Sequence, residues 1–120
     1  MRAAGLAVVA LVLAGCDSGP KVRVINRAKN EASFTSGGWP TQLLPGAWQV
    51  LPAPRAEDGY RVEVDEHGAK RCYDLGAFTA KIAAAPANDI YSLEFRDPQM
   101  GVGRPSAPRY EAMIDPTPCP

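Results

Sequence analysis

Tyr60-Arg61-Val62-Glu63-Val64-Asp65 alternates apolar and charged residues without a break, and it is the clearest structural signal in this chain. Successive side chains of a β-strand point to opposite faces of the sheet, so the alternation predicts a strand with one buried face and one wet face. Glu66-His67-Gly68 follows with residues typical of a turn, and it predicts a hairpin into a second strand at Lys70–Asp74.

The same alternation recurs along much of the chain after residue 20. Pro45-Gly46 fits a type II turn, and twelve prolines and eleven glycines argue against long helices. Short strands separated by turns predict an all-β fold, namely a small antiparallel β-sandwich of the immunoglobulin-like kind, with a small β-barrel as the alternative. The remaining predicted strands are Val22–Arg27, Phe78–Ile82 and Tyr91–Arg96, with weaker candidates at Ala32–Ser36, Ala47–Leu51 and Tyr110–Ile114.

Two segments depart from this pattern. Lys81–Ala87 holds one isoleucine among several alanines and is also compatible with a helical turn. Pro98–Pro108 shows no periodicity and is interrupted by prolines and glycines, so we expect a long loop there.

The chain has 13 basic and 13 acidic residues among 120, and charges of both signs are interspersed along the predicted strands. A nucleic-acid-binding protein of this size would carry a basic stripe, which the sequence lacks, so we expect no nucleic-acid partner. The length suits a single domain with one modest hydrophobic core.

The N-terminal residues have the features of an export signal. Arg2 precedes an apolar run from Ala3 to Leu13, which is shorter than the roughly twenty residues that a membrane-spanning helix needs. The run leads into Leu13-Ala14-Gly15-Cys16, which resembles the lipobox of a bacterial lipoprotein signal peptide. The resemblance implies cleavage before Cys16, diacylglycerol and palmitate at that cysteine, and a lipid anchor that faces the periplasm or the cell exterior.

This resemblance divides the chain into a signal peptide at 1–15, a lipidated tether at 16–20 and a single β-domain at 21–120 with a proline-rich C-terminal tail. Asp17 directly follows the lipidated cysteine, which resembles the inner-membrane retention signal of Gram-negative lipoproteins and slightly favours the inner membrane in such a cell. The β-domain itself resembles no specific family.

Cys72 and Cys119 remain once Cys16 carries lipid. Small exported domains commonly use such a pair as a disulfide, so we predict a bridge that also ties down the tail, Pro116-Thr117-Pro118-Cys119-Pro120. The alternative is a reactive or metal-binding thiol pair, although two cysteines without a nearby histidine make a poor zinc site.

Candidate catalytic residues are few. His67 is the only histidine, and its place in a predicted hairpin turn indicates a solvated residue rather than a general base or metal ligand. No serine lies in a Gly-x-Ser-x-Gly context, and Gly101-Val102-Gly103 lacks the strand-to-helix setting of a phosphate-binding loop. The sequence therefore predicts no catalytic residue, no metal and no cofactor.

The two tryptophans receive different interpretations. Trp48 lies within a predicted strand, and we expect it in the core. Trp39 stands between Gly37-Gly38 and Pro40, so we expect it in a loop, either as a binding contact or folded back as a lid over one end of the sandwich.

The sequence thus predicts a membrane-anchored envelope lipoprotein that acts as a non-catalytic binding or accessory module, with an envelope protein as partner. One alternative is an inhibitor of an exported enzyme, which would use the Trp39 loop or the loop at Pro98–Pro108. A small hydrolase or metal-dependent enzyme is less favoured, because any such activity would depend on His67.

Overall fold

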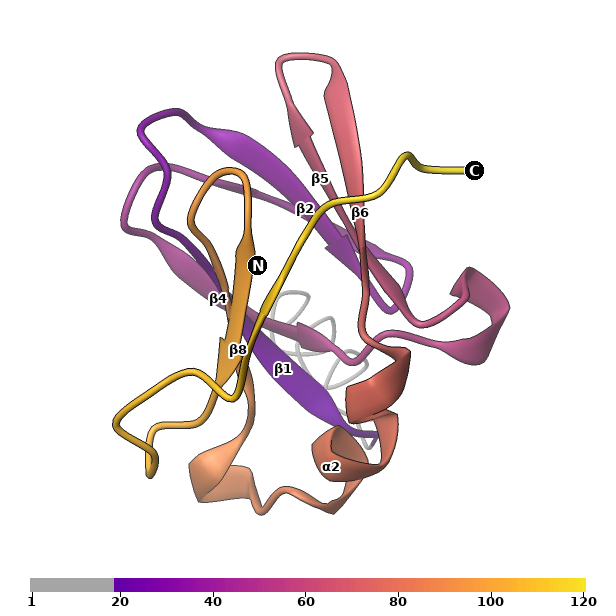
Figure 1. Ribbon diagram of the computed structural model, residues 1–120, viewed down its shortest axis with the longest axis vertical. Coiled ribbons are helices and arrows are strands. Elements are labelled where there is room, and N and C mark those ends of the chain that lie inside the picture. The colour runs from indigo at the N-terminus through magenta and orange to yellow at the C-terminus, as the bar shows by residue number, and fades with distance from the viewer. Residues whose placement is uncertain (1–18) are drawn as a thin grey trace, which may run out of the picture.

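The computed structural model describes residues 19–120. The predicted signal peptide at 1–15, the lipidation site Cys16 and Asp17 therefore lie outside the described residues. Two β-sheets pack around one hydrophobic core, and a short helix lies at one end of them (Figure 1). The predicted all-β sandwich is confirmed.

Nine strands and several helical segments make up the described chain. The strands are β1 (Lys21–Asn26), β2 (Ala32–Ser36), β3 (Trp39–Leu43), β4 (Trp48–Pro52), β5 (Arg61–Glu66), β6 (Ala69–Asp74), β7 (Ser92–Phe95), β8 (Met100–Gly103) and β9 (Ala112–Ile114). The helical segments are η1 (Ala56–Asp58), η2 (Gly76–Phe78), α2 (Thr79–Ala84) and η3 (Ala87–Asp89). The five-stranded sheet has the order β4-β1-β7-β8-β9 and the four-stranded sheet the order β3-β2-β5-β6. Neighbouring strands are antiparallel except for β1 and β7, which are parallel.

Period-two alternation places one side of each main strand in the core. Val62 and Val64 of β5 are buried, whereas the charged residues between and beside them are partly exposed, as the sequence predicts. Phe34 of β2 and Phe95 of β7 meet edge to face, with ring centroids 5.8 Å apart. Full burial of one such side chain contributes roughly 1.5–3 kcal/mol, so this contact is a main link between the two sheets.

A helix replaces one predicted strand. Residues 76–84 form η2 and then α2, so the strand predicted at Phe78–Ile82 is wrong. Phe78 and Ile82 are four residues apart and share one face of a helix as readily as one face of a strand, and the neighbouring alanines favour the helix. No helix in residues 19–120 is long and apolar enough to cross a membrane.

Two strands arise where the sequence indicated loop. β8 lies inside Pro98–Pro108, where Met100 and Val102 are buried and alternate with glycines. β3 includes Pro40, which lacks an N–H, and it is tolerated there because β3 is an edge strand that pairs only with β2.

The predicted disulfide is present. Cys72 and Cys119 are bonded, and their Cα atoms are 5.1 Å apart. Beside the bridge, Thr117 N–H donates to Cys72 O at 2.8 Å, and Cys72 N–H donates to Thr117 O at 2.9 Å. The proline-rich tail is thereby fixed along β6, which is an edge strand of the four-stranded sheet.

Candidate functional site

The outer face of the five-stranded sheet carries the candidate site. Strand register places its central side chains in two rows, and the residues between these rows face the core. Ile25 and Ser92 point outward, yet each is only 7% exposed, so part of this face is covered. The first row consists of Arg23, Ser92 and Gly103. The second row consists of Ile25, Glu94 and Gly101.

The cover is the loop at 104–110, which joins β8 to β9. It folds back over the sheet because β8 has glycine at its outward positions. A Cβ at Gly101 would lie 2.8 Å from Cε1 of the Tyr110 ring, which is closer than real Cβ atoms approach other heavy atoms. The glycines that obscured β8 in the sequence therefore make room for Tyr110.

Hydrogen bonds hold this loop in place. Asp89 accepts one from Ser106 Oγ at 2.6 Å and one from Ser106 N–H at 3.0 Å, and these bonds lower the pKa of Asp89. Glu111 N–H donates to Val102 O at 2.7 Å where the chain rejoins the sheet. The loop is attached at its middle and at its end, so it forms a fixed wall.

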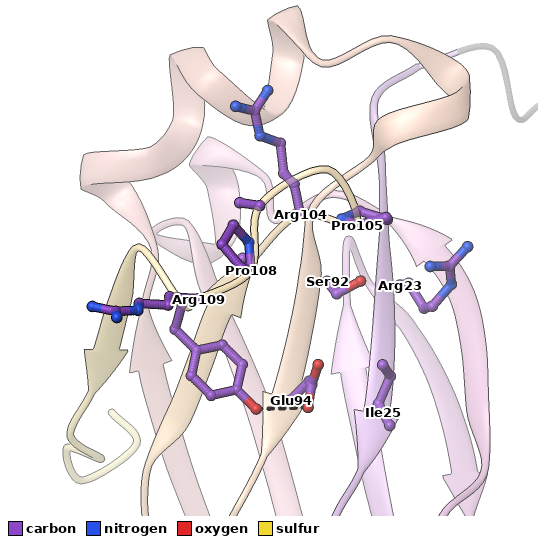
Figure 2. Close-up of a pocket in the computed structure, with 11 residues that line it drawn as sticks. Arg23, Ile25, Ser92, Glu94, Arg104, Pro105, Pro108 and Arg109 are labelled. Carbon is purple, nitrogen blue, oxygen red and sulfur yellow. Dashed lines mark hydrogen bonds between the residues drawn. The ribbon is translucent and has the colours of Figure 1, made fainter.

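An open groove of about 600 Å³ lies between this wall and the sheet (Figure 2). Ile25, Ser92 and Glu94 form its floor, and Pro105 and Pro108 belong to the wall. Ligand pockets in proteins typically measure about 300–1,000 Å³, so the groove is large enough for a small ligand or a short peptide.

Glu94 on the floor is already neutralised by its neighbours. Its Oε1 accepts hydrogen bonds from Tyr110 OH at 2.7 Å and from Arg27 Nε at 3.2 Å, and Arg96 Nη1 lies 3.7 Å away. Burial, followed by the hydrogen bond to Glu94, raises the pKa of Tyr110. The phenol therefore stays protonated at neutral pH and remains a hydrogen-bond donor to the carboxylate.

Arg23 lacks such a partner. Its guanidinium carbon lies 4.9 Å from the centroid of the Trp48 ring, in a cation–π contact. Its Nε is buried and makes no hydrogen bond within residues 19–120, although an unpaired buried donor is unfavourable by about 1–3 kcal/mol.

Trp48 itself corrects the expectation that it lies in the core, because its side chain is 56% exposed. It pairs with Ile25 of β1 on the outer face of the sheet, whereas Leu51 takes the core position in β4. An exposed aromatic ring therefore stands beside the groove, with Arg23 stacked on it.

Arginines gather around the groove. Of the eight arginines in residues 19–120, five line it or contact Glu94 on its floor. Two of them pair with Glu94, and a third pairs with Glu111 at 3.5 Å. The other two, Arg23 and Arg109, pair with no carboxylate in the part of the chain that the structure describes. The five are Arg23, Arg27, Arg96, Arg104 and Arg109.

Trp39, the binding contact predicted from the sequence, does not line this groove. It is the first residue of β3, so its predicted place in a loop is wrong, and Gly37-Gly38 alone form the turn before it. Its side chain is 49% exposed at the edge of the four-stranded sheet. His67 lies exposed in the β5–β6 turn with φ of 54°, as expected for a solvated turn residue.

The cysteine pair forms the predicted disulfide and not the alternative metal site. A carboxylate oxygen of Glu63 and the sulfurs of Cys72 and Cys119 lie within 4.8 Å of one another. The two sulfurs are bonded to each other, and a cysteine binds metal as a thiolate.

Comparisons of the chain with protein-family models, with curated proteins and with solved structures found no match. The groove must therefore be interpreted from its own residues. Sequence reasoning missed it because it joins three strands and a loop that are distant along the chain. The one local signal was the pair Gly101 and Gly103, which lie in the segment that the sequence predicts to be a long loop.

Proposed function

We propose that this protein is a lipid-anchored, non-catalytic binding module of the cell envelope, and that the groove beside the loop at 104–110 is its recognition site. The observation that carries this proposal is an open groove of about 600 Å³ whose floor is a β-sheet and whose wall is held by hydrogen bonds from Ser106 to Asp89. A site that is already ordered avoids much of the entropy loss that binding otherwise requires.

The residues of the groove support binding rather than acid–base chemistry. Ser92 and Tyr110 supply its hydroxyl groups, and the Tyr110 hydroxyl is already engaged with Glu94. The only histidine of the chain, His67, lies in a turn of the other sheet, so Ser92 has no histidine base on its own sheet. A serine without an adjacent base is a weak nucleophile.

The lipid anchor belongs to the same proposal. Cys16 precedes Gly19 by three residues, and three residues span at most about 10 Å of extended chain. Lipid on Cys16 would therefore keep the β-domain beside the membrane, where another envelope protein is the expected partner. An inhibitor of an exported enzyme is one form that such a module can take.

Site-specific cross-linking tests this proposal. We expect p-benzoylphenylalanine at Ala107, which lines the groove, to give a light-dependent adduct of discrete size in intact cells. The same amino acid at Gln42, an exposed residue of β3 on the other sheet, is the control and should give none. Equal adducts from both positions, or none from Ala107, would contradict a recognition role for the groove.

A further inference from the structure

We infer that the groove recognises an acidic, extended segment of a partner protein, and that one carboxylate of this segment docks on Arg23 beside Trp48. The inference rests on the proposed function, because it assigns a class of ligand to the same groove. It depends on the chemistry of Arg23, on the placement of a second arginine and on the apolar surface between them.

Arg23 offers a prepared site for a carboxylate. The Trp48 ring lies 4.9 Å from the guanidinium carbon and packs against it in a cation–π contact. The guanidinium makes no hydrogen bond and no ion pair within residues 19–120; its Nε is buried but its Nη groups are not, so a carboxylate at the outer end would displace no existing bond. A carboxylate has two oxygens that match the parallel N–H groups of a guanidinium, which makes it a well-suited ligand.

Arg109 shows that the ligand must be extended. It lies across the groove from Arg23, and the two guanidinium groups point away from each other (Figure 2). A single small anion therefore cannot bridge them, whereas a chain that crosses the groove can present one negative charge to each. Glu94 between them does not oppose such a chain, because Arg27 and Arg96 already neutralise it.

The surface between the two arginines favours a polypeptide over an acidic polysaccharide. Ile25 on the floor and Pro105, Ala107 and Pro108 on the wall are apolar, and they suit apolar side chains that a polysaccharide does not have. Tryptophan, tyrosine and arginine are also the residue types that contribute most to protein–protein binding energy. A segment in which acidic and apolar residues alternate would match both the two arginines and the apolar surface between them.

The test uses the mature full-length protein in detergent micelles, with a hexapeptide of alternating glutamate and leucine as the probe. The resonance of Arg23 Nε–H, identified by its loss in Arg23→Lys, should shift on titration and reach saturation. Arg23→Lys keeps the charge but lacks the parallel N–H groups of a guanidinium, and we expect it to weaken peptide binding at least tenfold. Arg61→Lys, in β5 of the other sheet, is the matched control and should leave the affinity unchanged.

Three outcomes would overturn the inference. A glutamine-for-glutamate peptide that binds as tightly would remove the role of charge. An oligogalacturonate of equal charge that binds more tightly than the peptide would replace a protein partner with a polysaccharide. No shift at millimolar peptide would refute the acidic ligand class altogether. If the peptide fails while the adduct at Ala107 still forms, the proposed function stands and only the ligand class is lost.

Discussion

Opening the Cys72–Cys119 bridge is the perturbation whose effect follows most directly from the structure. The two cysteines are 47 residues apart, and closing a loop of that length in the unfolded chain stabilises a fold by about 4 kcal/mol. Small domains are stable by only about 5–15 kcal/mol in total, so Cys119→Ser should remove a large share. Cys119 is the position to change, because Cys72 is only 3% exposed and its substitution would also disturb the core.

The assay is urea unfolding of three samples, namely the oxidised wild type, the reduced wild type and Cys119→Ser. We expect the variant to lose about 3–4 kcal/mol of unfolding free energy, and its melting temperature to fall by about 12–30 °C at roughly 4–8 °C per kcal/mol. The reduced wild type should match the variant, because both have the same open loop.

A loss below about 1 kcal/mol would refute the loop-closure reasoning. It would mean that the two backbone hydrogen bonds between Thr117 and Cys72 hold the tail without the covalent bond. A steeper dependence of the unfolding free energy on urea in the variant would agree with this reasoning, because the unfolded chain without the cross-link exposes more surface.

Gly101→Ala should displace Tyr110 from Glu94 and destabilise the fold by about 1–3 kcal/mol, which thermal melting would measure. Gly103→Ala is the control and should destabilise the fold less, because its Cβ would have its nearest neighbour at 3.4 Å. Asp89→Asn should lower the melting temperature at neutral pH. The folded-state pKa of Asp89 is lowered from its usual 3.8, so the ionised carboxylate adds stability that is fully present above pH 3.8. This stability is lost as the pH falls through the folded-state pKa, and variant and wild type should converge below it. Trp39→Ala should change both partner binding and the melting temperature little, because Trp39 is 49% exposed on β3 and does not line the groove; clearly weaker binding would place a contact on the four-stranded sheet.

The fold could be predicted wherever the outward residues of a strand are charged. In β5 the outward residues are arginine, glutamate and aspartate, so the alternation with Val62 and Val64 is unmistakable. In β8 the outward residues are glycines, which carry no polarity, and the strand looked like a loop. Phe78 and Ile82 are four residues apart, a spacing that suits a strand and a helix equally, so the periodicity of the sequence does not distinguish the two structures.

The candidate site was harder to predict than the fold, because periodicity shows that a strand has two faces but not which face is buried. Trp48 and Val50 share one face of β4 and Leu51 lies on the other, and all three are apolar. Trp48 was therefore assigned to the core on its residue type. The disulfide was predictable because residues 19–120 contain only two cysteines, so their pairing required no knowledge of the topology.

One feature of the groove, the unpaired Arg23, lowers stability in the isolated domain and supports a binding role. Gly101 and Gly103, beside the groove residues Glu94 and Ser92, are explained by packing, because a Cβ at Gly101 would lie 2.8 Å from the Tyr110 ring. Arg23 keeps a buried N–H without a partner in the same groove. Proteins depart from locally favourable choices mainly where function requires it, and a bound carboxylate would supply the counter-ion that Arg23 lacks within residues 19–120. A face selected for stability alone would instead pair the arginine with a carboxylate of the same domain.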